Sequence, residues 1–490
     1  MAAIPRPAAV FDREHEWADL DAFATGAVDA RRIGIVYGRR RFGKSFLLEH
    51  LALATGGFYY QALEETRVTS LDRFAKQVAA YAGLGGLPVG AFEDWPAALA
   101  AVARSTAGRP TVIDEFPYLL RESPEISSAI EDAYDRVATG RHPGLKLIIC
   151  GSALSVMTDV LTGMRALRGR AMLDMPIVAF DYRQARRFWN ITDVRTAFLV
   201  DSVLGGAAGY RDIAGSAPSE PGDVPDWLAA TLLNPSHALF REAEYLLTED
   251  PTLVDRALYR SIIAAIVEGE STRRGVGNRL GRPDTALDHP LGQLGRAGFI
   301  VRDADLLRSN RPLIRVNDPV LRFHFIVLRP DLARFEMRKT ADAWADAEPR
   351  FASGVVGPHF EAIARRWTAA YASRKTLGGA AMRVGFAQVN DPERKTAYEI
   401  DVVAEAAGQK DHDRTRLLAI GEAKGSEGLR RIGDLRRLER LRSDLGTRAD
   451  TGRTKILLFG RSGFDADLVT ESRRRADVEL VDLDRLYDGD

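Results

Sequence analysis

A strand-like apolar segment that leads directly into a glycine-rich loop narrows the possible folds of this chain more than any other feature. The segment RIGIVYG covers residues 32–38, and GRRRFGKS begins at its last residue, Gly38. A strand, a loop with two glycines and a Lys-Ser pair at the start of a helix have the spacing of a phosphate-binding loop. The glycines let backbone amides turn inward, and the helix directs its positive end at an anion. We therefore expect an α/β domain around this loop.

The loop and its flanks supply the expected nucleotide contacts, with ATP and Mg²⁺ as the expected cofactors. We expect Lys44 to reach the β- and γ-phosphates and the Ser45 hydroxyl to hold Mg²⁺. The structural alternative is a glycine turn that only caps a helix. The expected cofactor-binding residues are Gly38, Arg39, Arg40, Arg41, Phe42, Gly43, Lys44, Ser45 and Phe46.

Short apolar segments alternate with longer amphipathic ones over the first 180 residues, which is typical of a parallel sheet covered by helices. This pattern predicts a P-loop ATPase core over residues 1–180 and a helical lid over 181–255. The lid contains a Gly-, Pro- and Ser-rich break. The predicted strands of the core are 32–38, 56–63, 110–116, 145–152 and 171–180.

Two acids end the third predicted strand, in TVIDEF. We expect Asp114 to hold the Mg²⁺ and Glu115 to orient or deprotonate an attacking water, an arrangement that favours ATP hydrolysis. A pair of strand-end or helix-capping carboxylates is the alternative. Ser152 ends the fourth strand and is a candidate sensor of the γ-phosphate.

Arginines after the fourth strand, in LRGRA, provide further candidates for the nucleotide site. Arg168 or Arg170 is expected to stabilise transition-state charge, within one chain or across to a neighbouring copy. A solvated arginine cluster explains the same residues equally well.

The overall charge directs the chain to no particular partner, because its 68 basic and 68 acidic side chains balance over 490 residues. The single cysteine, Cys150, excludes an intramolecular disulfide and fits a reducing compartment. No apolar run has the length of a membrane span or a signal peptide, so we expect a cytoplasmic protein without membrane contact.

A winged helix is predicted over residues 256–320, with helices near 256–268, 271–280 and 284–297 and a following hairpin. Residues 256–330 hold 13 arginines, no lysine and 7 acids, a local excess of +6 that attracts phosphates. This basic excess makes DNA or another nucleic acid one expected partner. Pro290 falls in the middle of the third predicted helix and is expected to kink it, which argues against direct reading of a major groove by this helix. A protein-contact module is the alternative.

A second α/β domain is predicted over residues 351–490, after a connector at 321–350. Asp401 lies in YEIDVVAEA, and Glu422 and Lys424 lie in RLLAIGEAK, with 20 residues between Asp401 and Glu422. On one strand, Glu422 and Lys424 share a face. This is the D…E-x-K pattern of metal-dependent nucleases, in which two carboxylates hold Mg²⁺ or Mn²⁺ and the lysine polarises water. Glu361, on the preceding predicted helix, is the candidate third acid.

Several segments in series resemble the archaeal-type AAA ATPases of the STAND-related group that carry a C-terminal domain called DUF234. The segments are YGRRRFGKSFLLEH, IDEFPYLL, LIICGSALSVM, LVDSVLGGAAGY and VNDPVLRFHFIVLRP. The resemblance implies an ATP-dependent module, a winged helix and a domain with the fold of PD-(D/E)xK nucleases. The sequence departs from the family pattern in the lid, where LGGAAGY stands in place of LGG-V-P.

Together these features predict an ATP-hydrolysing protein that gates metal-dependent cleavage of nucleic acid by its last domain. The alternative is a regulatory ATPase whose winged helix and nuclease-like domain only contact proteins or DNA. The sequence leaves open whether the chain forms a homo-oligomer.

Overall fold

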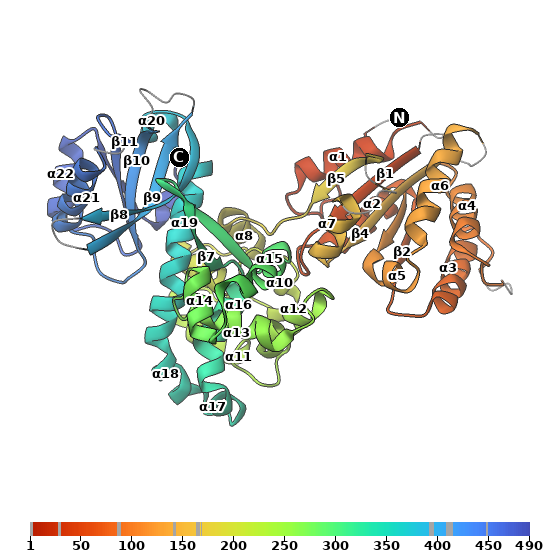
Figure 1. Ribbon diagram of the computed structural model, residues 1–490, viewed down its shortest axis with the longest axis horizontal. Helices are drawn as coiled ribbons and strands as arrows, with labels where there is room; N and C mark the ends of the chain where they lie inside the picture. Colours follow the sequence, from red (N-terminus) through yellow and green to blue (C-terminus); the bar gives the residue numbers. More distant parts are fainter. Residues whose placement is uncertain are drawn as a thin grey trace. The chain divides into compact units, whose positions relative to one another are not determined.

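The chain folds into two units, each with its own sheet (Figure 1). The computed structural model describes residues 3–27, 31–85, 90–140, 144–162, 167, 169–391, 396–407, 415–446 and 449–490. The first unit consists of Met1–Phe180, Ala207–Tyr210 and Tyr245–Val254. The second consists of Asp181–Gly206, Arg211–Glu244 and Asp255–Asp490.

A parallel five-stranded sheet with the order β2-β3-β4-β1-β5 forms the centre of the first unit. Each strand coincides with a predicted one, which confirms the prediction of an α/β unit. Because the carboxyl ends of parallel strands meet at one edge, the segments that follow β1, β3 and β4 emerge together. The strands are β1 Arg31–Tyr37, β2 Phe58–Gln61, β3 Thr111–Asp114, β4 Leu145–Gly151 and β5 Ala171–Pro176.

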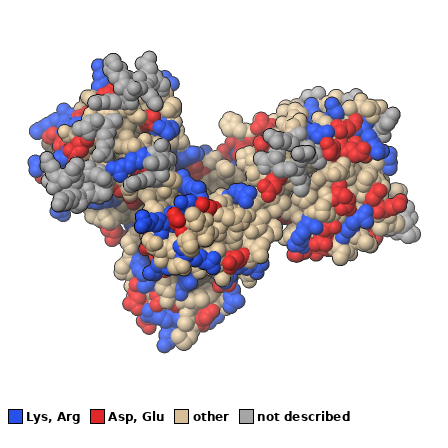
Figure 2. All heavy atoms as spheres, in the orientation of Figure 1, with Lys and Arg blue, Asp and Glu red and all other residues tan. Residues whose placement is uncertain are grey.

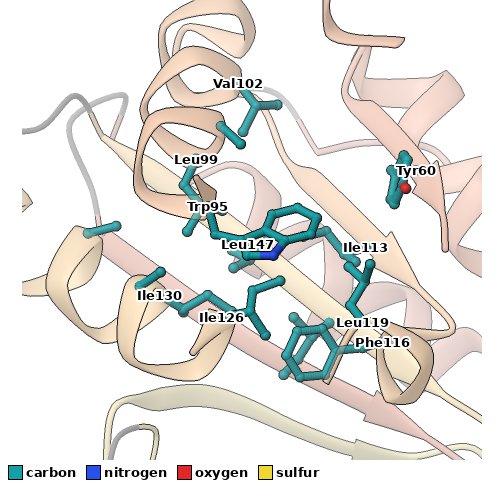
Figure 3. Packing of buried hydrophobic residues seen from close by; sticks show 14 of the residues in the cluster. Tyr60, Trp95, Leu99, Val102, Ile113, Phe116, Leu119, Ile126, Ile130 and Leu147 are labelled. Atoms are coloured by element: carbon teal, nitrogen blue, oxygen red, sulfur yellow. The ribbon is translucent and has the colours of Figure 1, made fainter. Parts of the chain in front are cut away.

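Alternate residues of the central strands enter two different cores, because successive side chains point to opposite faces of a sheet. Ile113 of β3 joins a core with helices α3 to α6, while its neighbour Val112 joins a core with α1 and α2. In Figure 3, the indole of Trp95 lies among Ile113, Leu147 and Ile126. Full burial of an aliphatic side chain such as Ile113 or Leu147 contributes about 1.5–3 kcal/mol. Coverage of both faces explains why the strands are apolar almost throughout.

Helices cover both faces of this sheet. Their bounds are α1 Glu14–Ala24, α2 Lys44–Thr55, α3 Arg67–Tyr81, α4 Trp95–Thr106, α5 Phe116–Glu122, α6 Ile126–Ala138 and α7 Leu154–Thr162.

Residues 181–255, predicted as a lid, are helical and contribute to both units. The first of these helices begins at a capping box: Asp181 accepts from the Gln184 amide at 2.9 Å, and the Gln184 side chain accepts from the Asp181 amide at 2.8 Å. The helices are α8 Tyr182–Trp189, α9 Val194–Leu204, α10 Tyr210–Ala214, α11 Val224–Ala230 and α12 Glu242–Glu249.

The next region has the predicted order of three helices and a hairpin: α13 Arg256–Val267, α14 Arg273–Leu280, α15 Asp288–Arg296, β6 Ile300–Asp305 and β7 Arg308–Val316. The prediction that Pro290 kinks the third helix was wrong. A 3₁₀ turn occupies Asp284–Leu287, and α15 begins only at Asp288. Pro290 thus lies in the first turn, where backbone amides have no partner within the helix.

The β6–β7 hairpin is continuous with the sheet of the last domain, whose order is β13-β12-β10-β9-β8-β6-β7 with β11 beside β10. Asp305, at the end of β6, pairs with Phe386 of β8, and its carboxylate accepts from the Gln388 amide at 3.1 Å. The remaining strands are β8 Ala381–Asp391, β9 Thr396–Ala406, β10 Thr415–Lys424, β11 Ala449–Asp450, β12 Lys455–Gly460 and β13 Val478–Val481.

Helices accompany this sheet and lead into it. They are α16 Pro319–Phe323, α17 Leu332–Glu336, α18 Thr340–Phe351, α19 Gly357–Ala370, α20 Arg374–Leu377, α21 Ile432–Leu445, α22 Ala466–Arg474 and α23 Leu483–Asp488. Within the described ranges, no helix combines the length and the apolar character needed to cross a membrane.

Candidate functional sites: a glycine-loop cluster and an acidic cluster

The glycine-rich loop joins β1 to α2, and its backbone conformation depends on its glycines. A Cβ atom at Gly38 would lie 2.1 Å from the Ile177 carbonyl oxygen, so only glycine fits there. Gly43 has a φ of 88° and immediately precedes the first residue of α2, Lys44. This arrangement of strand, loop and helix N-terminus is that of a phosphate-binding loop.

The Lys44 side chain is only 5% exposed and extends along the loop. Its Nζ donates to the Arg39 carbonyl oxygen at 3.0 Å. An ammonium group has three donors, so this bond leaves capacity for phosphate oxygens. Lys44 therefore has the position and the donors expected of a phosphate ligand.

The acid pair lies at the same sheet edge, because β3 ends at Asp114. The Asp114 side chain is fully buried, and its Oδ1 accepts from the Glu115 amide at 2.8 Å. Glu115 has a φ of 50°, in the left-handed region that few non-glycine residues occupy. Ser152, which follows β4, donates from Oγ to Oε2 of Glu115 at 3.2 Å.

The pKa of Glu115 shows which charges surround it. Burial raises this pKa, and the Asp114 charge raises it further, whereas Lys44 and the Ser152 hydrogen bond lower it. The structure thus brings together Lys44, Asp114, Glu115 and Ser152 from three separate segments of the chain. A carboxyl whose pKa lies above its ordinary value suits a general base better than a fully stabilised carboxylate.

Tyr59 completes this cluster and was not predicted from the sequence. Its hydroxyl donates to Oδ2 of Asp114 at 2.7 Å from the adjacent strand β2. Burial, followed by the Asp114 charge, raises the pKa of Tyr59, so the phenol stays protonated as a donor. No local pattern in the sequence places Tyr59 beside Asp114, because the contact depends on the order of the strands.

Tyr59→Phe is expected to destabilise the first unit by ~1–3 kcal/mol, because Oδ2 of the buried Asp114 loses a hydrogen bond. It should also raise the Mg²⁺ concentration needed for nucleotide binding, since Asp114 would be less firmly oriented. Urea denaturation and a Mg²⁺ titration measure the two effects. Tyr245→Phe, at a tyrosine that is 53% exposed, is the matched control. Equal behaviour of the two variants would contradict a positioning role for Tyr59.

The segment Ala207–Tyr210 of the lid region belongs to the first unit and packs against the glycine-rich loop. The Gly209 amide donates to the Arg41 carbonyl oxygen at 2.8 Å. A Cβ atom on Gly209 would lie 3.1 Å from Cδ of Arg41, and the Arg41 guanidinium lies 6.0 Å from the Tyr210 ring centroid. Within LGGAAGY, the sequence that departs from the family pattern, the part Ala207–Tyr210 therefore contributes one wall of this site.

The other loop residues differ in exposure. Arg39 is 8% exposed and its guanidinium lies 5.8 Å from the ring centroid of Phe42, whereas Arg40 is exposed. Phe46 is 47% exposed and its ring lies 4.1 Å from that of His50. Exposed aromatic surface beside a phosphate-binding loop is available to a nucleotide base.

Of the two candidate arginines, Arg170 forms ion pairs with Glu131 at 2.8 Å and Asp135 at 3.1 Å, both on α6. A role at the nucleotide would require Arg170 to leave these acids. Arg168 lies outside the described residues.

A second cluster lies in the second unit, where α19 packs against the sheet. Carboxylate oxygens of Glu361 on α19 and of Glu399 and Asp401 on β9 lie within 4.8 Å of one another. Burial raises the pKa of Asp401 to about 7, and the Glu361 charge contributes to the rise. Burial also raises the pKa of Glu361. Three crowded carboxylates, whose repulsion a divalent cation would relieve, form a suitable donor set for Mg²⁺ or Mn²⁺.

Glu422 and Lys424 lie beside this cluster, but their side chains pair with residues outside it. The Ala423 amide donates to Oδ2 of Asp401 at 2.8 Å, so the E-x-K segment lies against Asp401. Glu422 is 6% exposed and contacts Arg437 at 3.2 Å, while Lys424 donates to Asp434 at 3.1 Å. Of the predicted metal ligands, the structure groups Glu361 and Asp401, and it adds Glu399 in the place expected of Glu422.

Sequence reasoning missed Glu399 and Arg315. Glu399 lies two residues before Asp401, and residues at this spacing share a face of a strand, so alternation could have indicated it. Arg315 of β7 contacts Glu399 at 2.7 Å and Glu361 at 3.4 Å. That contact required knowledge of the packing between the hairpin and the last domain.

Basic and acidic side chains are interspersed over both units on the face shown in Figure 2. This distribution agrees with the balanced composition.

Comparison with known proteins gives one curated relative and several solved structures that are similar to this chain. No family model matches the sequence. The uncharacterized protein MJECL04 of Methanocaldococcus jannaschii is 25% identical over 311 residues, which cover 62% of this chain and 65% of that protein. The chain thus spans slightly less than two thirds of the length of this relative.

Solved structures similar to the chain include a Walker-type ATPase and an ORC2 protein. The Walker-type ATPase PABY2304 of Pyrococcus abyssi is 19% identical with a TM-score of 0.49, over 66% of this chain and 97% of that one. The ORC2 protein of Aeropyrum pernix, in its ADPNP-ADP complexes, is 14% identical with a TM-score of 0.38, over 69% and 97% of the two chains. Similarity at this level carries no information on activity.

Proposed function

We propose that the first unit binds and hydrolyses ATP with Mg²⁺. The observation that supports this function most directly is the convergence of Lys44, Asp114, Glu115 and Ser152 beside a glycine-rich helix N-terminus. These residues supply a cation for the phosphates, a carboxylate for the metal, a general base and a hydroxyl group at the end of a strand. Phosphoryl transfer to water uses groups of these kinds.

In this mechanism each residue has a separate task. Lys44 and the loop amides hold the phosphates, and Ser45 and Asp114 hold Mg²⁺, which neutralises phosphate charge when bound. Glu115 orients the attacking water and accepts its proton. Ser152 donates to Glu115 in this structure, and with ATP bound its hydroxyl would instead donate to the γ-phosphate.

Glu115→Gln is expected to reduce the rate of phosphate release by about 10²–10⁴, the usual contribution of a general base, while ATP affinity stays within a few-fold. Single-turnover phosphate release and calorimetric ATP binding measure the two quantities. Glu122→Gln, on the exposed end of α5, is the control for the same change of charge. Full activity of Glu115→Gln would assign the base to another residue.

For the second unit, we propose metal-dependent cleavage of a phosphodiester bond in DNA or another nucleic acid, gated by the nucleotide state of the first unit. The supporting observation is the grouping of Glu361, Glu399 and Asp401 beside the E-x-K segment. A divalent cation held there would supply charge for a bound phosphate and lower the pKa of a coordinated water. Lys424 and Glu422 would position that water from the neighbouring strand.

A regulatory ATPase with a non-cleaving last domain is the second candidate. It is favoured by the engagement of Glu422 with Arg437, Arg430 and Lys424 at 3.2–3.7 Å, because cations already balance this carboxylate. Cleavage assays with Mn²⁺ on single- and double-stranded DNA and on RNA separate the two candidates. Absence of cleavage together with nucleic-acid binding would favour the regulatory one.

A further inference from the structure

We propose that a cavity in the second unit binds a phosphate ester, held by Arg322 and by its neighbours Arg315 and Arg365. The cavity has a volume of about 500 Å³ and lies between the β6–β7 hairpin and α19. Its charged lining consists of Asp303, Arg315, Arg322, Arg365 and Glu399. Glu399 also belongs to the acidic cluster, so the cavity and the candidate metal site adjoin each other.

Arg322 is the least compensated of the three arginines. Its Nη2 donates to the Val316 carbonyl oxygen at 2.7 Å, and among the described residues it forms no ion pair. The pKa of Arg322 is lowered to about 10, mainly by burial; the charges of Arg315 and Arg365 also lower it, whereas those of Asp318 and Glu361 raise it. An anion in the cavity would relieve this repulsion.

The other two arginines are already directed by neighbouring groups. Arg365 donates to the Asp401 carbonyl oxygen at 3.0 Å, and burial and Arg315 lower its pKa. Arg315 is held by Glu399 at 2.7 Å and Asp303 at 3.2 Å. Planar guanidinium groups fixed in this way donate to phosphate oxygens at little cost in side-chain entropy.

A phosphate ester fits this cavity better than a simple carboxylate does. The lining combines three cations with two acids, and the acids suit a ligand that arrives with a divalent cation. Phosphate esters bind both arginines and divalent cations. The choice of a phosphate ester as the ligand therefore rests on the proposed metal-dependent function. The arrangement of the three arginines is observed independently of that function.

Calorimetry with inorganic phosphate tests the proposal, in a Lys44→Ala background so that the glycine-rich loop does not contribute. Arg322→Gln is expected to weaken phosphate binding by at least about tenfold, and added Mn²⁺ is expected to strengthen binding to the unchanged cavity. A short single-stranded DNA and AMP, titrated in parallel, distinguish a nucleic-acid backbone from a free nucleotide as the source of the phosphate ester.

Arg302→Gln is the matched control, because Arg302 is exposed and lies on β6 between the cavity residues Val301 and Asp303. Alternation directs it to the other face of the hairpin. A second variant keeps every arginine: Ala362→Glu adds a carboxylate to the cavity wall and should also weaken binding, whereas Ala369→Glu on the same helix should not.

The proposal is overturned if no phosphate probe binds, or if Arg302→Gln weakens binding as much as Arg322→Gln does. If the protein binds phosphate but neither binds Mn²⁺ nor cleaves nucleic acid, the cavity site is supported and the nuclease function is refuted. Loss of ATP hydrolysis affects neither result.

Discussion

Lys44→Ala is expected to weaken ATP–Mg²⁺ binding by about a hundredfold or more. Hydrogen bonds from a charged group contribute about 1.5–3 kcal/mol each, and Lys44 has donors for more than one phosphate oxygen. Loss of ~3 kcal/mol corresponds to a factor of about one hundred in affinity. Calorimetric titration of ATP with Mg²⁺ measures the change directly.

The control is Lys76→Ala, because Lys76 is 65% exposed and pairs with Asp72 across one helical turn. Its removal should leave ATP affinity unchanged. If Lys44→Ala retained the affinity of the wild type, the glycine-rich loop would not be a nucleotide site. The functions proposed for Asp114 and Glu115 would then have to be abandoned as well.

Nucleotide gating of the second unit can be examined with the same variant. If ATP controls nucleic-acid binding or cleavage, Lys44→Ala should make either activity independent of added ATP. An ATP effect that survives this substitution would show that another site responds to the nucleotide.

The grouping of side chains around the glycine-rich loop was largely predictable because its parts are local in sequence. The loop from Gly38 to Ser45 contains its own glycines, lysine and helix start, and TVIDEF ends a strand with both acids. Parallel strands then bring Asp114 and Ser152 to the edge where Lys44 lies. Tyr59 was not predictable, since its contact with Asp114 depends on which strand neighbours β3.

The acidic cluster was only partly predictable because it combines a helix, a strand and a hairpin. Glu361 and Asp401 were identified, but the third carboxylate in the structure is Glu399 rather than Glu422. No local sequence pattern indicates that Arg315 of the hairpin contacts the cluster. Similarly, the position of Pro290 depends on where α15 begins, and helix boundaries are the least certain part of a sequence-based prediction.

Asp401→Asn is expected to reduce Mn²⁺ affinity of the second unit by at least about tenfold and to abolish any metal-dependent cleavage. Changes to groups that only orient metal ligands already cost 10–100-fold, and Asp401 is proposed as a ligand itself. Asparagine can still accept the Ala423 amide hydrogen bond through its carbonyl oxygen. Titration with Mn²⁺, followed by its electron paramagnetic resonance signal, measures the affinity.

Although Asp401→Asn should lower the Mn²⁺ affinity, it should raise the stability of the metal-free protein at pH 8. This combination distinguishes loss of a metal ligand from loss of the fold. The pKa of Asp401 is about 7 in the folded chain against an ordinary 3.8, so between these pH values the folded chain binds more protons than the unfolded chain. The Asp401 contribution therefore makes the metal-free protein less stable as pH rises through this range. Asp401→Asn should remove this part of the pH dependence and raise stability at pH 8, whereas Asp484→Asn, at an exposed residue of α23, should change neither quantity. Mn²⁺ affinity of Asp401→Asn equal to that of the wild type would exclude Asp401 as a metal ligand. Lower stability of Asp401→Asn than of the wild type would show that the Asp401 carboxylate is chiefly structural.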